Sequence, residues 1–222
     1  MNPLAQAFIF DVEGTLIECV ALVLQCWQRT LASHGFAFSV EELHQYSGMD
    51  GKLMLATLVP RLSPSARKLL LDEQGERYRK DYIQQARALP DVDRLFDWLS
   101  RNGRQTALAT TSQPDELRHY LKLLRITDKV TATVCGDEVS KEKPASDLID
   151  VALKKLPAPH GEVIVVGDSP YDAQAAQEAG AIAFGVLTGG FSADELQKAG
   201  CKEIASDPAN LLRILVRQGT TA

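Results

Sequence analysis

The sequence predicts an α/β protein with a parallel sheet core, helices on both faces of the sheet, and an inserted all-helical cap domain. Three observations support this fold class. A short apolar segment near the N-terminus is followed by a long stretch with helical periodicity only. From residue 89 onward, short apolar segments alternate with helical patterns, as expected for parallel strands joined by helices. The apolar fraction of 45% and the charged fraction of 24% over 222 residues are those of an ordinary globular protein.

The first strand is expected at residues 7–10, AFIF. This segment is a continuous apolar run ended by Asp11, which is typical of a strand buried on both faces. A turn is expected at 13–16. Helical periodicity then extends over about residues 18–34, with its apolar side chains on one face, and Gly35 ends it.

Residues 39–86 also have helical patterns. Ser39 and Glu42 have the spacing of a capping box at a helix start. The segment GMDG at 48–51 interrupts the helices, and residues 63–86 are charged and amphipathic. This stretch is therefore expected to form several helices rather than one.

The predicted domain boundaries follow from these patterns. No strand is expected between residues 17 and 86, so residues 17–86 are predicted to form the cap domain. Residues 1–16 and 87–222 are predicted to form the catalytic core. The remaining core strands are expected at 106–109, 130–134, 162–166 and 182–186, and the core helices at 91–101, 114–124, 145–155, 170–179 and 208–217.

Charge and composition argue against several classes of function. The net charge is -5 and the lysines and arginines are scattered, so no nucleic-acid partner is expected. No apolar run approaches the roughly 20 residues of a membrane span, and the N-terminus lacks a basic signal segment. We therefore expect no membrane partner and a cytoplasmic location. The four cysteines are dispersed, which favours buried, reduced thiols. Both a monomer and a homodimer fit the sequence.

Polar residues follow the predicted strands, at the carboxyl ends where open parallel sheets bind their ligands. Because these ends meet at one edge of the sheet, the side chains are expected to lie near one another. They are Asp11, Glu13, Thr110, Thr111, Ser112, Lys143, Asp168 and Asp172.

These residue types suit a phosphate site. Asp11, Asp168 and Asp172 would repel one another if brought together unpaired. Mg²⁺ would offset that repulsion, because it prefers carboxylate oxygens, water and phosphate as ligands. Thr110 precedes a helix N-terminus, where free N–H groups favour an anion, and Lys143 can hold the same anion as a point charge. Asp11 is then placed to attack phosphorus and form an aspartyl-phosphate.

Four segments, FIFDVEGTL, ALATTS, KEKPASD and VVGDSPYDAQAA, together resemble the motifs of the haloacid dehalogenase superfamily. The similarity is greatest to phosphoglycolate phosphatase-like and β-phosphoglucomutase-like members, which carry a helical cap. The resemblance implies a Rossmann-like core and a Mg²⁺-dependent enzyme. In it, Asp11 resembles the nucleophile and a metal ligand, and Asp168 resembles an acidic metal ligand. Asp172 resembles a second acid that holds either a metal-bound water or Lys143. Thr110 and Lys143 resemble the residues that hold the phosphate.

Glu13 departs from the superfamily pattern, which usually has aspartate at this position. The resemblance implies that this residue is the general acid and base and that its backbone carbonyl binds the metal. The extra methylene of glutamate moves the carboxyl by roughly 1 Å, and displacements of that size can lower a rate. The enolase-phosphatases of methionine salvage resemble this chain in having Asp-x-Glu-Gly-Thr, so Glu13 is compatible with an active enzyme.

The cap and the second motif are expected to contact the substrate. Thr111 and Ser112 are candidate substrate-binding residues of the core. Lys52 follows the break in the cap helices and is a candidate ligand for a substrate anion. His44 or Tyr46 is expected to flank that anion.

The predicted function is Mg²⁺-dependent hydrolysis of a small phosphomonoester, phosphoglycolate-like or a sugar phosphate, through an aspartyl-phosphate on Asp11. A phosphomutase of the β-phosphoglucomutase type is an open alternative, because the same motifs serve both reactions. A weakly active or regulatory protein is a second alternative, because Glu13 replaces the usual aspartate. A 2-haloacid dehalogenase is disfavoured, because such proteins usually carry an aromatic residue at the Glu13 position.

Overall fold

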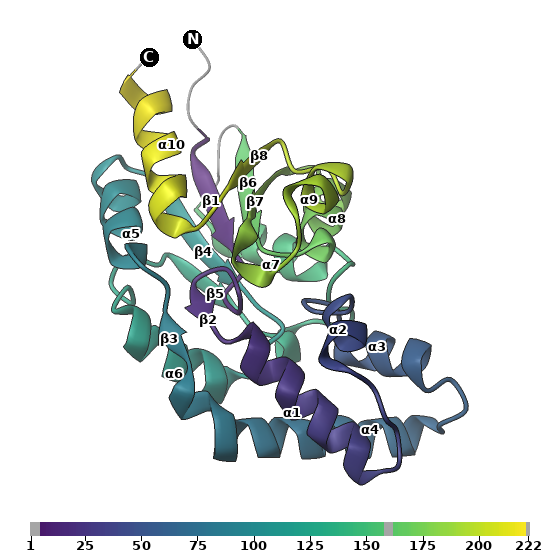
Figure 1. Ribbon diagram of the computed structural model, residues 1–222. Helices are drawn as coiled ribbons and strands as arrows, with labels where there is room; N and C mark the ends of the chain where they lie inside the picture. The colour runs from purple at the N-terminus through teal and green to yellow at the C-terminus, as the bar shows by residue number, and fades with distance from the viewer. Residues whose placement is uncertain (1–4, 158–161, 221–222) are drawn as a thin grey trace.

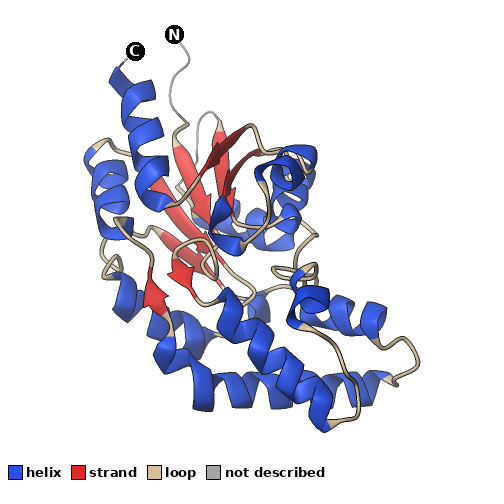
Figure 2. Ribbon diagram, in the orientation of Figure 1, coloured by secondary structure: helices blue, strands red, loops and turns tan. Residues whose placement is uncertain are grey.

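The computed structural model describes residues 5–157 and 162–220. In this part of the chain the centre is a six-stranded sheet in the order β5-β4-β1-β6-β7-β8, with all neighbouring strands parallel (Figures 1 and 2). The predicted α/β fold built on a parallel sheet is therefore confirmed. The strands are β1 (Ala7–Phe10), β4 (Gln105–Ala109), β5 (Ala132–Val134), β6 (Val163–Gly167), β7 (Ile182–Val186) and β8 (Glu203–Ala205).

Helices cover both faces of the sheet, and the alternation of side chains along β1 shows the two faces. Phe8 and Phe10 pack into one hydrophobic cluster, whereas Ala7 and Ile9 pack into another. The first cluster includes residues of α5 (Val92–Arg101), α6 (Pro114–Leu124) and α10 (Pro208–Thr220). The second includes residues of α7 (Asp147–Lys155), α8 (Pro170–Glu178) and α9 (Ala193–Lys198). Both faces of β1 are apolar because both are buried.

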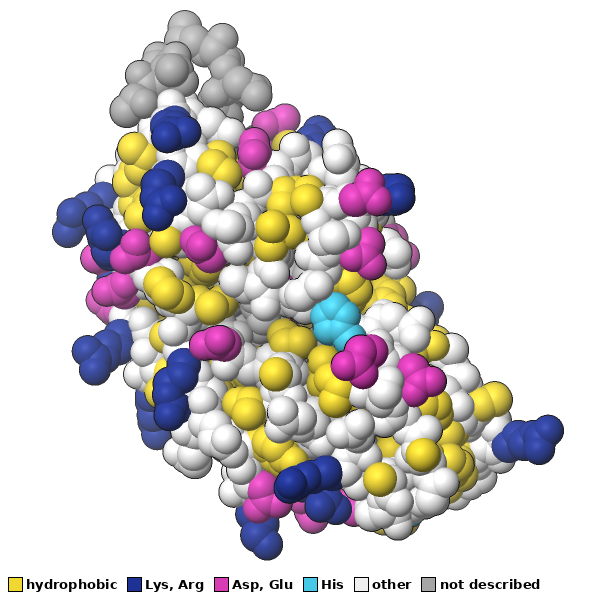
Figure 3. Space-filling view, viewed as in Figure 1, with side chains coloured by type: hydrophobic (Ala, Val, Ile, Leu, Met, Phe, Trp, Pro, Cys, Tyr) yellow, Lys and Arg dark blue, Asp and Glu magenta, His cyan; other side chains and the backbone are white. Residues whose placement is uncertain are grey.

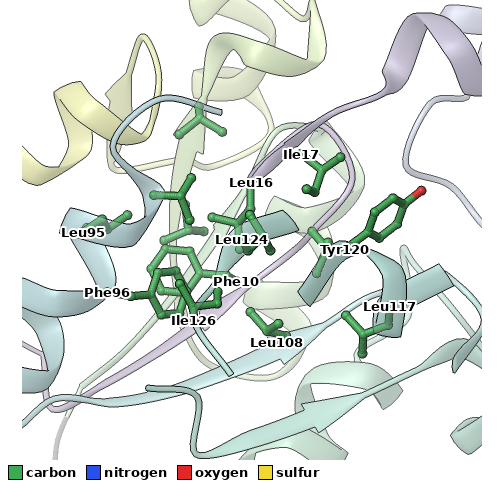
Figure 4. Close-up of a cluster of buried hydrophobic side chains, with 14 of the residues drawn as sticks. Phe10, Leu16, Ile17, Leu95, Phe96, Leu108, Leu117, Tyr120, Leu124 and Ile126 are labelled. Carbon is green, nitrogen blue, oxygen red and sulfur yellow. The ribbon is translucent and has the colours of Figure 1, made fainter. Parts of the chain in front are cut away.

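The larger cluster anchors the first strand (Figure 4). The rings of Phe10 and Phe96 lie 4.9 Å apart between centroids, and Leu95 and Leu108 are fully buried beside them. Such close packing fixes the end of β1, and with it the backbone from which the next residue, Asp11, extends.

The cap is a group of helices at one end of the molecule (Figure 1). Its own hydrophobic cluster contains Leu24, Trp27 and Leu31 of the first helix together with residues from the helices that follow. The expected capping box is present: Glu42 N–H donates to Ser39 Oγ at 3.1 Å, and Ser39 N–H donates to the Glu42 carboxylate at 2.7 Å. The cap elements are α1 (Val20–Ser33), α2 (Val40–His44), α3 (Gly51–Leu58), α4 (Pro64–Arg77), the π-helical turn η1 (Tyr78–Tyr82) and the short 3₁₀ turn η2 (Ile83–Gln85).

A second, two-stranded sheet joins cap and core. It pairs β2 (Ile17–Glu18) with β3 (Arg87–Ala88) in antiparallel orientation. The expectation that no strand lies between residues 17 and 86 was therefore wrong at its first two residues. A strand of two residues is too short to produce an alternating pattern.

The sequence also missed α9 and β8, which lie between β7 and the last helix. Two short 3₁₀ turns, η3 (Gly136–Glu138) and η4 (Leu187–Gly189), complete the core. Among the described residues, no helix is both long and apolar enough to cross a membrane. On the face shown in Figure 3, lysine and arginine side chains are scattered among acidic ones.

Candidate active site

The ends of two adjacent strands bring the first acidic residues together. Strands β1 and β6 are paired so that Phe10 lies opposite Val166. Asp11 N–H donates to the Val166 carbonyl at 2.9 Å, so the pairing continues one residue beyond the strand. Asp168 directly follows β6. Asp11 and Asp168 are thus neighbours because their strands are neighbours.

The turn after Asp11 places a hydroxyl between these two carboxylates. Thr15 Oγ1 lies 3.3 Å from Asp11 Oδ2 and 3.1 Å from Asp168 Oδ1. Gly14 has a φ of 81°, and a Cβ on it would lie 2.3 Å from Asp168 Oδ2. Glycine is required there for both reasons. The Gly-Thr pair of the first motif therefore has a geometric role beside the acids.

Lys143 contacts two of the acids from a buried position. Its Nζ forms an ion pair with Asp11 Oδ1 and a second with Asp172 Oδ1 at 2.7 Å. Asp172 lies in the first turn of α8, where its other oxygen accepts from the Ser169 hydroxyl at 2.6 Å. A Cβ on Gly167 would lie 2.2 Å from the Asp172 Cβ, so that glycine allows the approach. Asp172 holding Lys143 is one of the two arrangements that the sequence resemblance implies.

The acids have more negative charge than Lys143 can balance. Carboxylate oxygens of Asp11, Asp168 and Asp172 lie within 4.8 Å of one another. Burial raises the pKa of Asp11 to about 6, although Lys143 opposes the rise. Burial, and then the charge of Asp11, raises the pKa of Asp168 well above its ordinary value. A buried group of three carboxylates and one ammonium fits a divalent cation with oxygen ligands.

Glu13 lies beside these residues and has a partner that the sequence did not indicate. The Tyr120 hydroxyl donates to Glu13 Oε1 at 2.7 Å, and the Tyr78 hydroxyl lies 2.8 Å from that of Tyr120. Burial raises the pKa of Glu13 to about 7, with a further contribution from Glu116 and opposition from the Tyr120 hydrogen bond. Glu13 and Tyr120 are 107 residues apart, so no local pattern could have identified the pair.

The three hydroxyl residues after β4, Thr110, Thr111 and Ser112, have different surroundings. Thr110 is buried, and its hydroxyl donates to Ser112 Oγ at 2.9 Å and accepts from Ser112 N–H at 3.1 Å. Thr111 and Ser112 line the cavity in front of the acids. Gln113, and not one of these three residues, occupies the N-cap of α6.

A cavity of about 750 Å³ lies between core and cap, and Asp11 is the member of the group Asp11, Asp168 and Asp172 that lines it. Asp11 and Glu13 line it from the core, and Lys52 and Tyr46 line it from the cap. Lys52 Nζ lies 3.9 Å from Glu142 Oε1.

His44 instead contacts the core, through a hydrogen bond of 2.7 Å between its Nε2 and the Gly189 carbonyl. A second cap cation, Arg79, pairs with Glu116 of α6 at 3.2 Å and also lines the cavity. Arg79 was not identified from the sequence, because it lies among other charged residues of the cap.

Comparison with known proteins identifies the family. Residues 8–186 match the haloacid dehalogenase-like hydrolases. The chain belongs to this family. It is 27% identical to a phosphoglycolate phosphatase of Agrobacterium fabrum, over 85% of this chain and 83% of that protein. It is also 27% identical to pyrophosphatase PpaX of Bacillus pumilus, over 80% and 81% of the two chains. The crystal structure of a hydrolase from Pseudomonas syringae superposes with a TM-score of 0.89 at 31% identity, covering 96% of this chain and 98% of that one.

For this haloacid dehalogenase-like hydrolase, two sequence predictions are confirmed: the superfamily and the class of enzyme. The structure also brings Asp11, Lys143, Asp168 and Asp172 into one buried group. The roles of the individual residues stay predictions.

Proposed function

We propose that this hydrolase is a Mg²⁺-dependent phosphatase that cleaves a small phosphomonoester through an aspartyl-phosphate on Asp11. The observation that carries the proposal is the position of Asp11. Its carboxylate is buried at a strand end, paired with Lys143, beside the Thr15 hydroxyl, and it lines the cavity together with Glu13. The names of the relatives, which include a phosphoglycolate phosphatase and a fructose-1-phosphate phosphatase of Escherichia coli, agree with this reaction class.

Two steps follow from the positions of the side chains. In the first, an Asp11 oxygen forms a bond to phosphorus while the bond from phosphorus to the ester oxygen breaks. Protonated Glu13 gives its proton to that leaving oxygen. In the second, the Glu13 carboxylate takes a proton from water, the water oxygen bonds to phosphorus, and Asp11 is released with inorganic phosphate. A Glu13 pKa of about 7 allows both protonation states near neutral pH.

The metal is proposed to be held by Asp11, Asp168 and Asp172, with the backbone carbonyl of Glu13 as a further ligand. When bound, Mg²⁺ supplies positive charge to the carboxylates and to the phosphoryl oxygens. Lys143 supplies a second positive charge for the phosphoryl group. Burial disfavours its ammonium form, but Asp11 and Asp172 outweigh this and raise its pKa, so the side chain stays charged.

Substitution of the nucleophile tests the proposal. Asp11→Asn should lower phosphate release by at least about a thousandfold, since the amide cannot attack phosphorus. The measurement is inorganic phosphate released from a panel of phosphate esters with Mg²⁺ and with EDTA. Asp93→Asn, at an exposed site on α5, is the matched control and should keep wild-type activity. Wild-type activity in Asp11→Asn would contradict the proposal.

A further inference from the structure

The carboxyl of Glu13 is held by a tyrosine from a distant part of the core. Tyr120 is fully buried on α6, and its hydroxyl donates to Glu13 Oε1 at 2.7 Å. Its ring belongs to the cluster that packs α6 against the sheet, and its hydroxyl is directed away from the other side chains labelled in Figure 4. Because packing fixes the ring, it also fixes the position of the donor.

A second tyrosine fixes the direction of the hydrogen bonds. The hydroxyls of Tyr78 and Tyr120 lie 2.8 Å apart, and both residues are buried. A tyrosine hydroxyl has a single proton. Since Tyr120 donates that proton to Glu13, Tyr78 must donate to Tyr120. The chain therefore runs from η1 of the cap, through α6 of the core, to Glu13.

We propose that Tyr120 is a positioning residue that orients Glu13 for proton transfer to the leaving group, an inference that rests on the proposed phosphatase function. Glutamate has one more rotatable bond than the aspartate usual in this family, so its carboxyl needs a further constraint. The Tyr120 hydrogen bond provides that constraint. Because Oε1 accepts this hydrogen bond, Oε2 carries the transferable proton. That proton passes to the ester oxygen as its bond to phosphorus breaks and the bond from Asp11 forms.

The test uses two esters that differ in their need for an acid. 4-Nitrophenolate leaves phosphorus without a proton, whereas the alkoxide of β-glycerophosphate requires one. Tyr120→Phe keeps the ring and removes only the hydroxyl. We expect it to slow formation of the phosphoenzyme from β-glycerophosphate by about 10- to 100-fold. The rate from 4-nitrophenyl phosphate should stay within about twofold. Both rates are measured in single turnovers by rapid quench.

One mutant background and one further variant show whether Tyr120 acts through Glu13. In a Glu13→Gln background, adding Tyr120→Phe should slow β-glycerophosphate no further, since the group that it orients is gone. Tyr78→Phe should change the ratio of the two rates in the same direction as Tyr120→Phe, but less.

Tyr82→Phe is the matched control. Its buried hydroxyl has no hydrogen-bond partner among the residues that the structure describes, and its ring stacks near Tyr78. The ratio of the two rates should not change in this variant. Thermal unfolding of each variant checks that the fold is intact.

Different outcomes separate the two proposals. Suppose that the wild type transfers phosphate and Asp11→Asn does not. If Tyr120→Phe then slows the reaction of both esters equally, or of neither, the positioning role is overturned and the phosphatase proposal stands. If the wild type releases phosphate from no ester of the panel, these two included, the phosphatase proposal fails, and the positioning role falls with it.

Discussion

The carboxyl edge of the sheet and the helical cap use charged residues in opposite ways. At the sheet edge, the side chains of Lys143 and Asp172 are only 3% and 4% exposed and contact each other directly. In the cap, the side chains of Lys52 and Lys68 are 64% and 73% exposed; Asp72, which pairs with Lys68, is 56% exposed, whereas Glu142 of the core, which faces Lys52, is 12% exposed. A buried charge depends on its partner, whereas an exposed charge is solvated without one.

This difference between buried and exposed charges indicates where the sequence is constrained. Each charged residue at the sheet edge requires the others, so the residue types appear together as motifs. Lys52 and Lys68 of the cap are solvated, so neither depends on a partner in this way. For function, we propose a division of labour in which the sheet edge carries the chemistry and the cap adjusts which ester fits.

The largest effect on stability is expected from Lys143. Replacing it with methionine leaves buried carboxylates without a counter-charge, and loss of one partner of a buried ion pair costs about 3–5 kcal/mol. Urea unfolding without Mg²⁺ measures the change. Lys155→Met is the surface control, since Lys155 pairs with Glu138 and both side chains are more than a third exposed. That variant should lose no more than about 1 kcal/mol. Equal losses of unfolding free energy in the two variants would contradict the expected difference between buried and exposed ion pairs.

A smaller, pH-dependent effect is expected from Glu142, where cap and core meet. Burial, and then the charge of Asp50, raises its pKa to about 7. The folded protein therefore binds this proton more tightly than the unfolded chain does, and ionisation of Glu142 between about pH 4.5 and pH 7 lowers stability. Glu142→Gln should be more stable than the wild type at pH 8, by about 1–2 kcal/mol after allowance for partial exposure, and the gain should vanish near pH 4.5.

Glu138, an exposed glutamate, is the control, and its substitution should change stability in the opposite direction. A hydrogen bond from Lys155 lowers the pKa of Glu138. Its ionised form therefore stabilises the fold above the unfolded pKa, and that contribution is lost as the pH falls. Glu138→Gln should be slightly less stable than the wild type at pH 8. Urea unfolding at pH 5 and pH 8 measures both variants, and two shifts of the same sign would show that burial does not control the effect.

The smallest effect is expected from Lys52, one of the cap cations that line the cavity. Lys52→Ala should raise KM for an ester with a second anionic group by about three- to tenfold and leave kcat within about twofold. Lys80→Ala, an exposed lysine of η1 outside the cavity lining, is the control and should change neither constant. A fall in kcat alone would place Lys52 in the chemistry and not in substrate selection.

Some elements of the fold could be predicted from the sequence and others could not. The strand that ends before Asp11, the helix that begins at Pro170 and the capping box at Ser39 were all predicted, because each depends on a local pattern. Strand β8 was missed because it is a partly buried edge strand of three residues without alternation.

In the site, Asp11, Lys143, Asp168 and Asp172 were predicted because residues after parallel strands meet at one edge. Tyr120 could not be predicted in this way. It occupies an apolar position of α6, and only the three-dimensional packing shows that its hydroxyl reaches Glu13. Residues that act through the interior of the fold give no signal in their own neighbourhood.

The small β2–β3 sheet has a consequence for how such enzymes diversify. Ile17, where the chain leaves the core, is paired with Ala88, where it returns, and paired residues of this kind lie only about 5 Å apart. The inserted segment therefore leaves and re-enters the core at neighbouring positions, as a hairpin loop does. Its exchange for a larger, smaller or unrelated loop would leave the register of every core strand unchanged. The insertion, which we propose to select the ester, can thus be exchanged without moving the acidic residues at the sheet edge.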